Sequence, residues 1–314
     1  MNRGMRVWTG DPRFWGPGPA SGMALSIGVF DGLHRGHQEL LSGLASQAAA
    51  LADLPVGVVT FDVHPRAVLA PDRAPKTLMP VPRRLEVLES MSVDQVGVLP
   101  FAEVRHLSPD EFVHRVVVNG FKARLVIVGH DFRYGVGRAG NVTSLRESGE
   151  RNGFVVEARE LLRAGTDPIS SSMIRFRIAQ GDVAAAADLL GRPHELAAPH
   201  GTDRSGRSES GTVTADLDFD PAMAVPPPGA YAVRTVIGTG IHPGLCLVGY
   251  RRGPDGQPTP ARVHFVDRQP RIRPRDIVTL RFVERVRGPV SGPESSSWAL
   301  VREGDILRAR RLLR

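Results

Sequence analysis

The chain has 314 residues, 41% of them hydrophobic, with a single cysteine and a formal net charge of +7. This length is about right for two domains, and one cysteine excludes an internal disulfide bond and a cysteine-based metal cluster. No apolar run of about 18 residues is present, and residues 1–20 lack the apolar core of a signal peptide. These features predict a cytoplasmic protein without a membrane partner. The positive charge is spread along the chain as arginine, which favours phosphorylated small molecules over nucleic acid as partners.

The order of apolar and polar segments predicts two domains with different folds. In residues 1–190, short buried strands alternate with amphipathic helices, which predicts a Rossmann-like α/β domain whose parallel sheet has helices on both faces. In residues 191–314, β-branched runs alternate with Pro- and Gly-rich turns, which predicts a small antiparallel β-barrel. The strands expected in the first domain are residues 24–30, 55–61, 95–99, 125–128 and 154–158, and those expected in the second are residues 211–217, 231–237, 245–250, 261–266 and 277–286.

A Gly-rich turn follows the first predicted strand and leads directly into a predicted helix. The backbone is expected to turn tightly at Gly28 and Gly32, and the helix to begin near Gly36. The amide groups and the positive dipole end at a helix N-terminus suit a phosphate group. His34 and His37 are three residues apart, so both rings can reach the same side of the turn. The pattern predicts a nucleotide-binding loop.

Polar side chains also follow other predicted strands. In parallel sheets, ligands bind beyond the C-terminal ends of the strands, and His64, His130 and Asp131 all follow such ends. Further along the chain, three serines at 170–172 precede a predicted helix that carries Arg175. Hydroxyl groups and amides at a helix start, with an arginine one turn later, form a phosphate-binding cradle. We therefore expect two phosphate-binding segments in one site.

Six segments of the first domain carry motifs in a fixed order. They are Ile-Gly-Val-Phe-Asp-Gly-Leu-His-Arg-Gly-His at 27–37, Thr-Phe-Asp-Val-His-Pro at 60–65, Leu-Ser-Pro-Asp-Glu-Phe-Val at 107–113, Val-Gly-His-Asp-Phe-Arg-Tyr-Gly at 128–135, Ile-Ser-Ser-Ser-Met-Ile-Arg at 169–175, and 181–193, which ends in Leu-Leu-Gly-Arg-Pro. With these motifs the chain resembles the adenylyltransferase module of bifunctional bacterial riboflavin kinase/FAD synthetases. The resemblance implies ATP and FMN as substrates, FAD and pyrophosphate as products, and Mg²⁺ as cofactor, without direct protein ligands for the metal in the first domain.

The resemblance also implies roles for individual residues. The implied catalytic positions, at the ATP phosphates and the departing pyrophosphate, are His34, His37, Ser171 and Arg175. The implied nucleotide-binding positions are Gly28, Phe30, Asp31, Gly32, Gly36, Asp131, Ser170 and Ser172. The implied flavin-binding positions are Phe61, His64, Pro65 and Arg133.

Some positions depart from the family pattern or keep a structural alternative. Val63 stands where proline is usual, and His130 stands where glutamate is common. His130 could therefore alter the acceptor site. Asp31 could instead cap the turn, and His64 could be a hydrogen-bonded loop residue.

The second domain resembles the riboflavin kinase domain of the same family only in part. Where the family has Gly-Phe-Pro-Thr-Ala-Asn, this chain has Gly-Thr-Val-Thr-Ala-Asp at 211–216, so Thr214 is kept while Val213 replaces proline and Asp216 replaces asparagine. Arg262 stands where the family places the glutamate that activates riboflavin. An arginine cannot act as a general base at neutral pH. We therefore expect that the barrel has lost kinase activity.

Two other functions stay open at this point. A nucleotidyltransferase of the same fold could use CTP, a modified flavin or another phosphate acceptor. A protein of a different class, a flavin or nucleotide sensor, would use both sites for binding only. Neither the nucleotide base nor the oligomeric state is readable from the residues.

Overall fold

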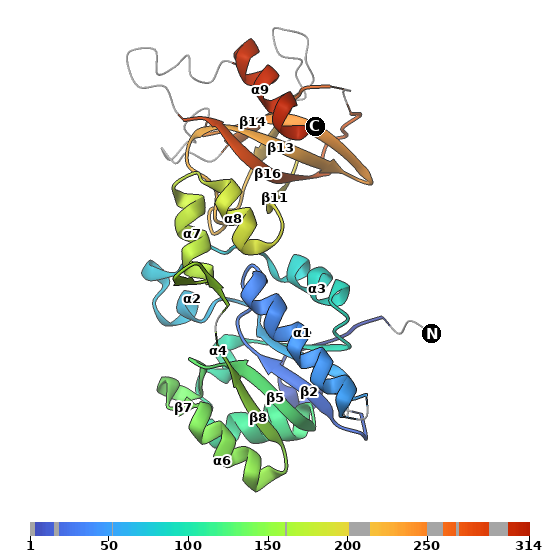
Figure 1. The fold of residues 1–314 in the computed structure, drawn as a ribbon, viewed down its shortest axis with the longest axis vertical. Coiled ribbons are helices and arrows are strands. Elements are labelled where there is room, and N and C mark those ends of the chain that lie inside the picture. Colours follow the sequence, from blue (N-terminus) through green and yellow to red (C-terminus); the bar gives the residue numbers. More distant parts are fainter. Residues whose placement is uncertain are drawn as a thin grey trace. The chain divides into compact units, whose positions relative to one another are not determined.

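The structure, a computed structural model, describes residues 4–15, 19–51, 53–160, 162–200, 214–249, 260–267, 270–288 and 301–314. The chain forms two compact units, Met1–Ser170 and Ser171–Arg314. Each unit has its own sheet (Figure 1). The units divide after Ser170, which lies before the domain boundary near residue 190 that the change in residue pattern predicted.

The first unit is built on a six-stranded sheet in which all neighbouring strands are parallel, as predicted. The strand order is β1-β4-β3-β2-β5-β8. The bounds are β1 (Arg6–Thr9), β2 (Met23–Ile27), β3 (Val56–Phe61), β4 (Gln95–Leu99), β5 (Ala123–Gly129) and β8 (Val155–Arg159). The sheet thus contains the five predicted strands and adds β1 at one edge, which the sequence analysis did not predict.

Helices connect these strands. The α-helices of the first unit are α1 (Arg35–Ala50), α2 (Pro65–Leu69), α3 (Val81–Ser90), α4 (Phe101–Val104), α5 (Pro109–Phe112) and α6 (Val142–Asn152). The other helical segments are η1 (Pro12–Phe14), η2 (Pro71–Arg73), the π-helix η3 (Val113–Gly120) and η4 (Val136–Arg138). Two small hairpins pair β6 (Arg133–Tyr134) with β7 (Gly140–Asn141) and β9 (Arg163–Ala164) with β10 (Asp167–Pro168).

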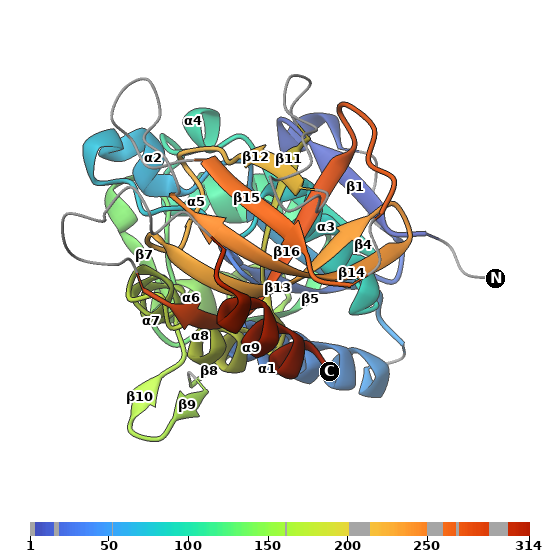
Figure 2. The same cartoon turned by 90° about the horizontal axis from the view of Figure 1, so that it is seen from above.

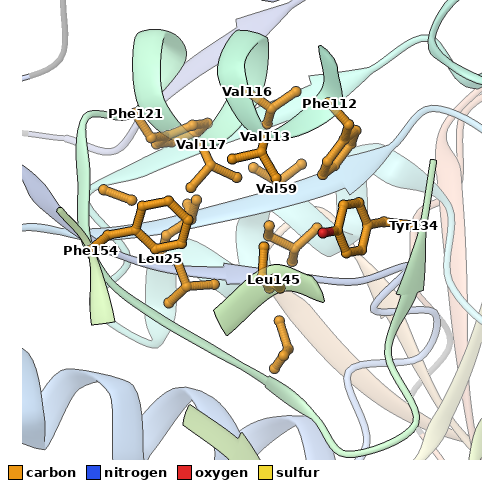
Figure 3. Packing of buried hydrophobic residues seen from close by; sticks show 14 of the residues in the cluster. Leu25, Val59, Phe112, Val113, Val116, Val117, Phe121, Tyr134, Leu145 and Phe154 are labelled. Carbon is orange, nitrogen blue, oxygen red and sulfur yellow. The ribbon is translucent and has the colours of Figure 1, made fainter. Parts of the chain in front are cut away.

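Apolar side chains of the sheet fill two separate cores, one on each face. Because successive residues of a strand point to opposite faces, Leu25 of β2 packs with the π-helix and α6, whereas Ala24 packs with α1 and α3. Figure 3 shows the first of these cores, with Val113 and Val116 of the π-helix close to Val59 of β3. This confirms the expected helices on both faces of the sheet.

The second unit contains an antiparallel sheet, as predicted, with six strands in the order β11-β16-β13-β14-β15-β12. Five strands were predicted, and the edge strand β11 was not among them. Its strands are β11 (His194–Pro199), β12 (Thr214–Asp218), β13 (Gly229–Ile237), β14 (Gly240–Val248), β15 (Pro260–Phe265) and β16 (Ile277–Arg287). A bridge between His200 and Leu217 links the ends of the two edge strands and curls the sheet toward a barrel.

The described part of the second unit has three helices: α7 (Ser171–Ala179), α8 (Val183–Leu190) and α9 (Glu303–Leu313). Val183 of α8 is buried in the barrel core, which explains why this helix belongs with the barrel rather than with the parallel sheet. Figures 1 and 2 show α9 against the sheet, where Ala309 packs with Leu245 and Leu247. Among the described residues, no helix has the length and apolar character needed to cross a lipid bilayer.

Candidate active site

The turn after β2 occupies the position in the sheet where a ligand site is expected. The strands that follow β2 in sequence, β3 and β4, lie on one side of it, while β5 and β8 lie on the other side. Such a reversal of strand order leaves a crevice at the C-terminal ends of the strands. The turns after β2 and β5 lie on either side of this crevice, and the turn after β3 is next to the turn after β2.

The backbone of the β2–α1 turn is strained. Gly32 has φ of +81°, and two residues with side chains, Phe30 and Leu33, also adopt positive φ values of +52° and +40°. Residues with side chains avoid this region, at a cost of about 1–3 kcal/mol each. Two glycines allow close packing, because a Cβ atom at Gly28 would lie 3.2 Å from the Phe30 ring and one at Gly36 would lie 3.2 Å from the His34 ring. The glycines therefore allow a compact turn, and the surrounding structure must offset the cost of the two strained residues.

The two histidines of the turn lie against each other. His34 is buried and is the N-cap residue of α1, and His37 lies one turn into the helix. Their rings are stacked, with centroids 3.7 Å apart and an angle of 21° between the planes. The Phe30 ring meets His37 edge-on, with centroids 5.0 Å apart. The expectation that both rings lie on one side of the turn is confirmed, and their catalytic role stays a prediction.

Asp31 connects the turn to a distant segment. Its carboxylate is buried and accepts hydrogen bonds from the amide of Leu78, at 3.1 Å to each oxygen, and from the amide of Met79 at 3.0 Å. The sequence analysis assigned Asp31 to nucleotide binding or to a turn cap. In the structure, the carboxylate instead binds backbone amides of the segment that precedes α3, and so it links the turn to that segment.

Arg84 is a charged residue of this region that the sequence analysis missed. It lies in α3, is only 3% exposed, and donates from Nη1 to Thr60 Oγ1 at 2.8 Å and to the Phe61 carbonyl at 3.0 Å. Burial lowers the pKa of its guanidinium, and the negative charge of Asp31 acts in the opposite direction. Arg84 and Leu88 are spaced so that they lie on one face of α3, and both are buried. This spacing was the one feature of the sequence that could have indicated the burial of Arg84.

The predicted flavin-side residues follow β3. Phe61 ends the strand, and its ring meets Phe101 edge-on with centroids 5.5 Å apart. His64 caps α2, where its Nδ1 accepts a hydrogen bond from the Arg66 amide at 3.1 Å, and Pro65 is the first residue of that helix. His64 therefore makes the local hydrogen bond that was the structural alternative to flavin binding. Its contact with flavin stays a prediction.

The turn after β5 presents exposed polar side chains. Asp131 and Arg133 are both exposed, and Arg133 Nη1 donates to the Phe132 carbonyl at 3.0 Å. His130, at the position where the family commonly has glutamate, is also exposed, and its Nδ1 lies 4.0 Å from the Glu160 carboxylate. These side chains are accessible to a ligand at the C-terminal edge of the sheet.

The predicted second phosphate-binding segment spans the division of the chain. Ser170 is the last residue of the first unit, while Ser171, Ser172 and Arg175 lie in the first turns of α7 in the second unit. The predicted helix is present, but it begins at Ser171, so that only Ser170 precedes it rather than all three serines. The convergence of this segment with the two histidines stays a prediction.

In the second unit, two of the positions that differ from the kinase pattern, Asp216 and Arg262, are charged and paired. Asp216 of β12 and Arg262 of β15 are direct partners in the sheet, and Arg262 Nε and Nη2 donate to the two oxygens of Asp216 at 2.7 and 2.9 Å. Thr214 lies opposite His264 in the same pair of strands. Burial, with a smaller contribution from the Arg262 cation, lowers the pKa of His264 to about 4, against the effect of Asp216. Val213 lies outside the described residues.

The described residues contain no group of three or more His, Cys, Asp or Glu side chains that could hold a metal ion. The expectation that the first domain provides no direct protein ligands for magnesium stays a prediction.

Comparisons with known proteins place these features in a family. A family model described as FAD synthetase matches residues 18–173. The bifunctional riboflavin kinase/FMN adenylyltransferase of Pseudomonas fluorescens is 35% identical over 231 residues, which cover 73% of each chain. The protein of the same name from Haemophilus influenzae is 31% identical over 293 residues, covering 92% of this chain and 94% of the relative.

A solved structure shares the complete two-unit fold. It is described as a macrolide-efflux protein from Streptococcus pneumoniae, and it matches with a TM-score of 0.81 and 23% identity over 92% of this chain and 93% of that chain. At this identity the likeness concerns the fold alone. The sequence relatives decide the family: this chain belongs to the bifunctional riboflavin kinase/FMN adenylyltransferases.

Proposed function

We propose that the chain synthesises FAD by transferring the adenylyl group of ATP to the phosphate of FMN. The observation that carries this proposal is the stacked pair His34 and His37 at the start of α1, at the strand-order reversal of the sheet. Membership in the family supports the choice of substrates. An ATP-dependent reaction and a single cysteine also fit a cytoplasmic protein.

The reaction needs no covalent enzyme intermediate. A phosphate oxygen of FMN attacks the α-phosphorus of ATP, the bond from the α-phosphorus to the bridging oxygen of the β-phosphate breaks, and pyrophosphate leaves with that electron pair. The protein therefore contributes position and charge stabilisation. His34 and His37 donate to phosphate oxygens on which negative charge increases, and the positive dipole end at the start of α1 adds to this effect.

The other residues have supporting roles in the proposal. Ser170, Ser171, Ser172 and Arg175 hold the departing pyrophosphate, because hydroxyls and a guanidinium at a helix start bind phosphate oxygens. The turn after β5, with Asp131 and Arg133, lines the substrate side. The FMN ring lies toward Phe61 and His64.

Magnesium enters this proposal with the nucleotide. Mg²⁺ keeps several water ligands and often binds through substrate phosphates rather than through a protein cage. The described residues have no cluster of ligands for it.

We also propose that the barrel does not phosphorylate riboflavin. A kinase needs a base near the riboflavin hydroxyl, and the position that the family gives to this base carries Arg262, which stays protonated at neutral pH. Arg262 is held in a two-point ion pair by Asp216, the residue that replaces the asparagine of the kinase pattern. At both positions, the side chain of the kinase pattern is thus replaced by one that forms a structural contact.

A product assay tests both parts of the proposal. The purified full chain is incubated with FMN or riboflavin and with ATP, CTP or GTP, and products are separated by chromatography. We expect FAD from FMN with ATP, and no FMN from riboflavin. FMN formed from riboflavin would contradict the loss of kinase activity.

The same assay decides between the alternatives. A faster reaction with CTP, or with a flavin other than FMN, would identify a specialised nucleotidyltransferase. Binding of FMN and ATP without any product would support the sensor. The intact pair of histidines in the turn after β2 favours the enzyme.

A further inference from the structure

We propose that Arg84 is a positioning residue for adenylyl transfer. Its guanidinium holds the phosphate-binding turn and the flavin-side end of β3 in one fixed arrangement. This inference rests on the proposed function, because the two segments matter together only if a nucleotide and a flavin react between them.

The guanidinium is buried and hydrogen-bonded to three residues in two segments of the chain. Nη1 donates to Thr60 Oγ1 at 2.8 Å and to the Phe61 carbonyl at 3.0 Å, and Nη2 donates a longer bond to the Met79 carbonyl at 3.5 Å. A charge that is only 3% exposed is costly unless it is hydrogen-bonded. The bonds of Arg84 therefore constrain the backbone that provides the acceptors.

Two routes lead from Arg84 to the β2–α1 turn. In the first, the Thr60 hydroxyl accepts from Arg84 and donates to the Val29 carbonyl at 2.9 Å, directly before Phe30. In the second, Met79 provides its carbonyl to Arg84 and its amide to the Asp31 carboxylate. The turn is thus held at Val29 and at Asp31 by groups that share Arg84 as a partner.

The same guanidinium fixes the end of β3. Phe61 is the last residue of the strand, and the carbonyl that Arg84 contacts lies where the chain leaves the sheet toward His64. The next residue, Asp62, receives amide hydrogen bonds from Val63 at 2.7 Å and from Phe101 at 2.9 Å. A shift of Arg84 would therefore move the base of the flavin side and the phosphate turn relative to each other.

Geometry matters more than charge in this arrangement. A lysine would keep the positive charge, but its ammonium group is a point charge and lacks the planar fork that reaches separate acceptors. Reacting groups that are displaced by about 1 Å can lose about a hundredfold in rate. Arg84→Lys therefore keeps the charge and removes the geometry, so a loss of rate in this variant indicates a positioning role rather than a requirement for charge.

The test measures kcat and KM for ATP and FMN in the full chain carrying Arg84→Lys, Thr60→Val or Thr60→Ser. The matched control is Arg146→Lys, at an exposed arginine of α6. We expect Arg84→Lys and Thr60→Val to lower kcat by about tenfold or more with KM values changed by less than about threefold. Thr60→Ser keeps the hydroxyl and should restore kcat to within about twofold, as should the control.

Amide hydrogen exchange provides a second readout that does not depend on turnover. We expect faster exchange at Leu78, at Met79 and across residues 28–34 in Arg84→Lys, but not in Arg146→Lys. Unchanged exchange, or unchanged kcat with only a lower melting temperature, would overturn the positioning role. If the unmodified chain makes no FAD, the proposed function fails, and the exchange data still decide whether Arg84 holds the two segments.

Discussion

Arg262 and Asp216 face each other on two neighbouring antiparallel strands and form a two-point ion pair, with N–O distances of 2.7 and 2.9 Å. The Asp216 side chain is only 10% exposed and that of Arg262 is 34% exposed. Both residues stand at positions where the chain departs from the kinase pattern that it resembles. This relationship leads to the first prediction.

Asp216→Asn should destabilise the second unit and leave FAD synthesis intact. The substitution keeps the shape of the side chain but removes the negative charge beside Arg262, so we expect the free energy of unfolding to fall by about 1–2 kcal/mol. Urea unfolding of the full chain measures this change. The control is Asp218→Asn on the exposed part of the same strand, which should have little effect. Equal stability of the two variants would show that the ion pair contributes nothing.

His37→Ala and His34→Ala should each lower the kcat for FAD formation by about a hundredfold or more, since each removes a donor to the transferring phosphate. The comparison is His114→Ala, at an exposed histidine in the π-helix η3, which should keep normal activity. Chromatographic detection of FAD measures the rates. A kcat within about threefold of the unmodified chain in either variant would rule out a phosphate-contact role for that histidine.

Gly36→Ala should reduce activity by disturbing a neighbour. The new Cβ atom would lie 3.2 Å from Cε1 and Nδ1 of His34, whose ring is stacked on His37. We expect kcat to fall by about tenfold because the ring must move. In the same helix, a Cβ atom at Gly43 would lie 4.0 Å from its nearest neighbour, so Gly43→Ala should keep activity and stabilise the helix by about 0.5–1 kcal/mol. Equal kcat values for the two variants would contradict the steric explanation.

The barrel should lose stability in acid because of His264. Burial depresses the pKa of His264 to about 4 in the folded state, from an ordinary value of 6.5. Above pH 6.5 the side chain is neutral in both states, and the full stability is present. As the pH falls from 6.5 toward 4, the unfolded chain binds a proton that the folded barrel does not bind, so the free energy of unfolding falls by up to about 3 kcal/mol.

Thermal unfolding between pH 7 and pH 4.5 measures this effect. His264→Gln removes the titrating group, so its melting temperature should depend less on pH over this interval. The control is His114→Gln, at an exposed histidine of the first unit. A pH dependence in His264→Gln equal to that of the unmodified chain would exclude His264 as the cause.

Much of the fold was predictable, because it depends on patterns that are local in the chain. The five predicted strands of the parallel sheet are present, and α1 begins at Arg35, close to the predicted start at Gly36. The edge strand β1 was not predicted, since its four residues follow no clear alternation and are mostly exposed. The placement of α8 was also not predicted, because its pattern shows an apolar face but not which core receives that face.

In the candidate site, the residue types were predictable while several contacts were not. The pair of histidines follows from their spacing on a helix. Arg84 was missed because a single arginine in a predicted helix is normally solvated, and nothing in the sequence indicates that Thr60 and Phe61 meet it. The carboxylate of Asp31 binds amides that lie 47 and 48 residues away in the chain.

By itself, the sequence determined the two folds and the Gly-rich turn with its histidines, and it predicted the loss of the kinase motif, because periodicity, turn residues and side-chain chemistry are local properties. Only the tertiary structure decided that Asp31 binds Leu78 and Met79, that Arg84 joins two sides of the site, and that Arg262 is neutralised by Asp216. The physical reason is that burial and hydrogen bonding depend on which distant segments meet. The energies of these contacts arise only when the chain is folded.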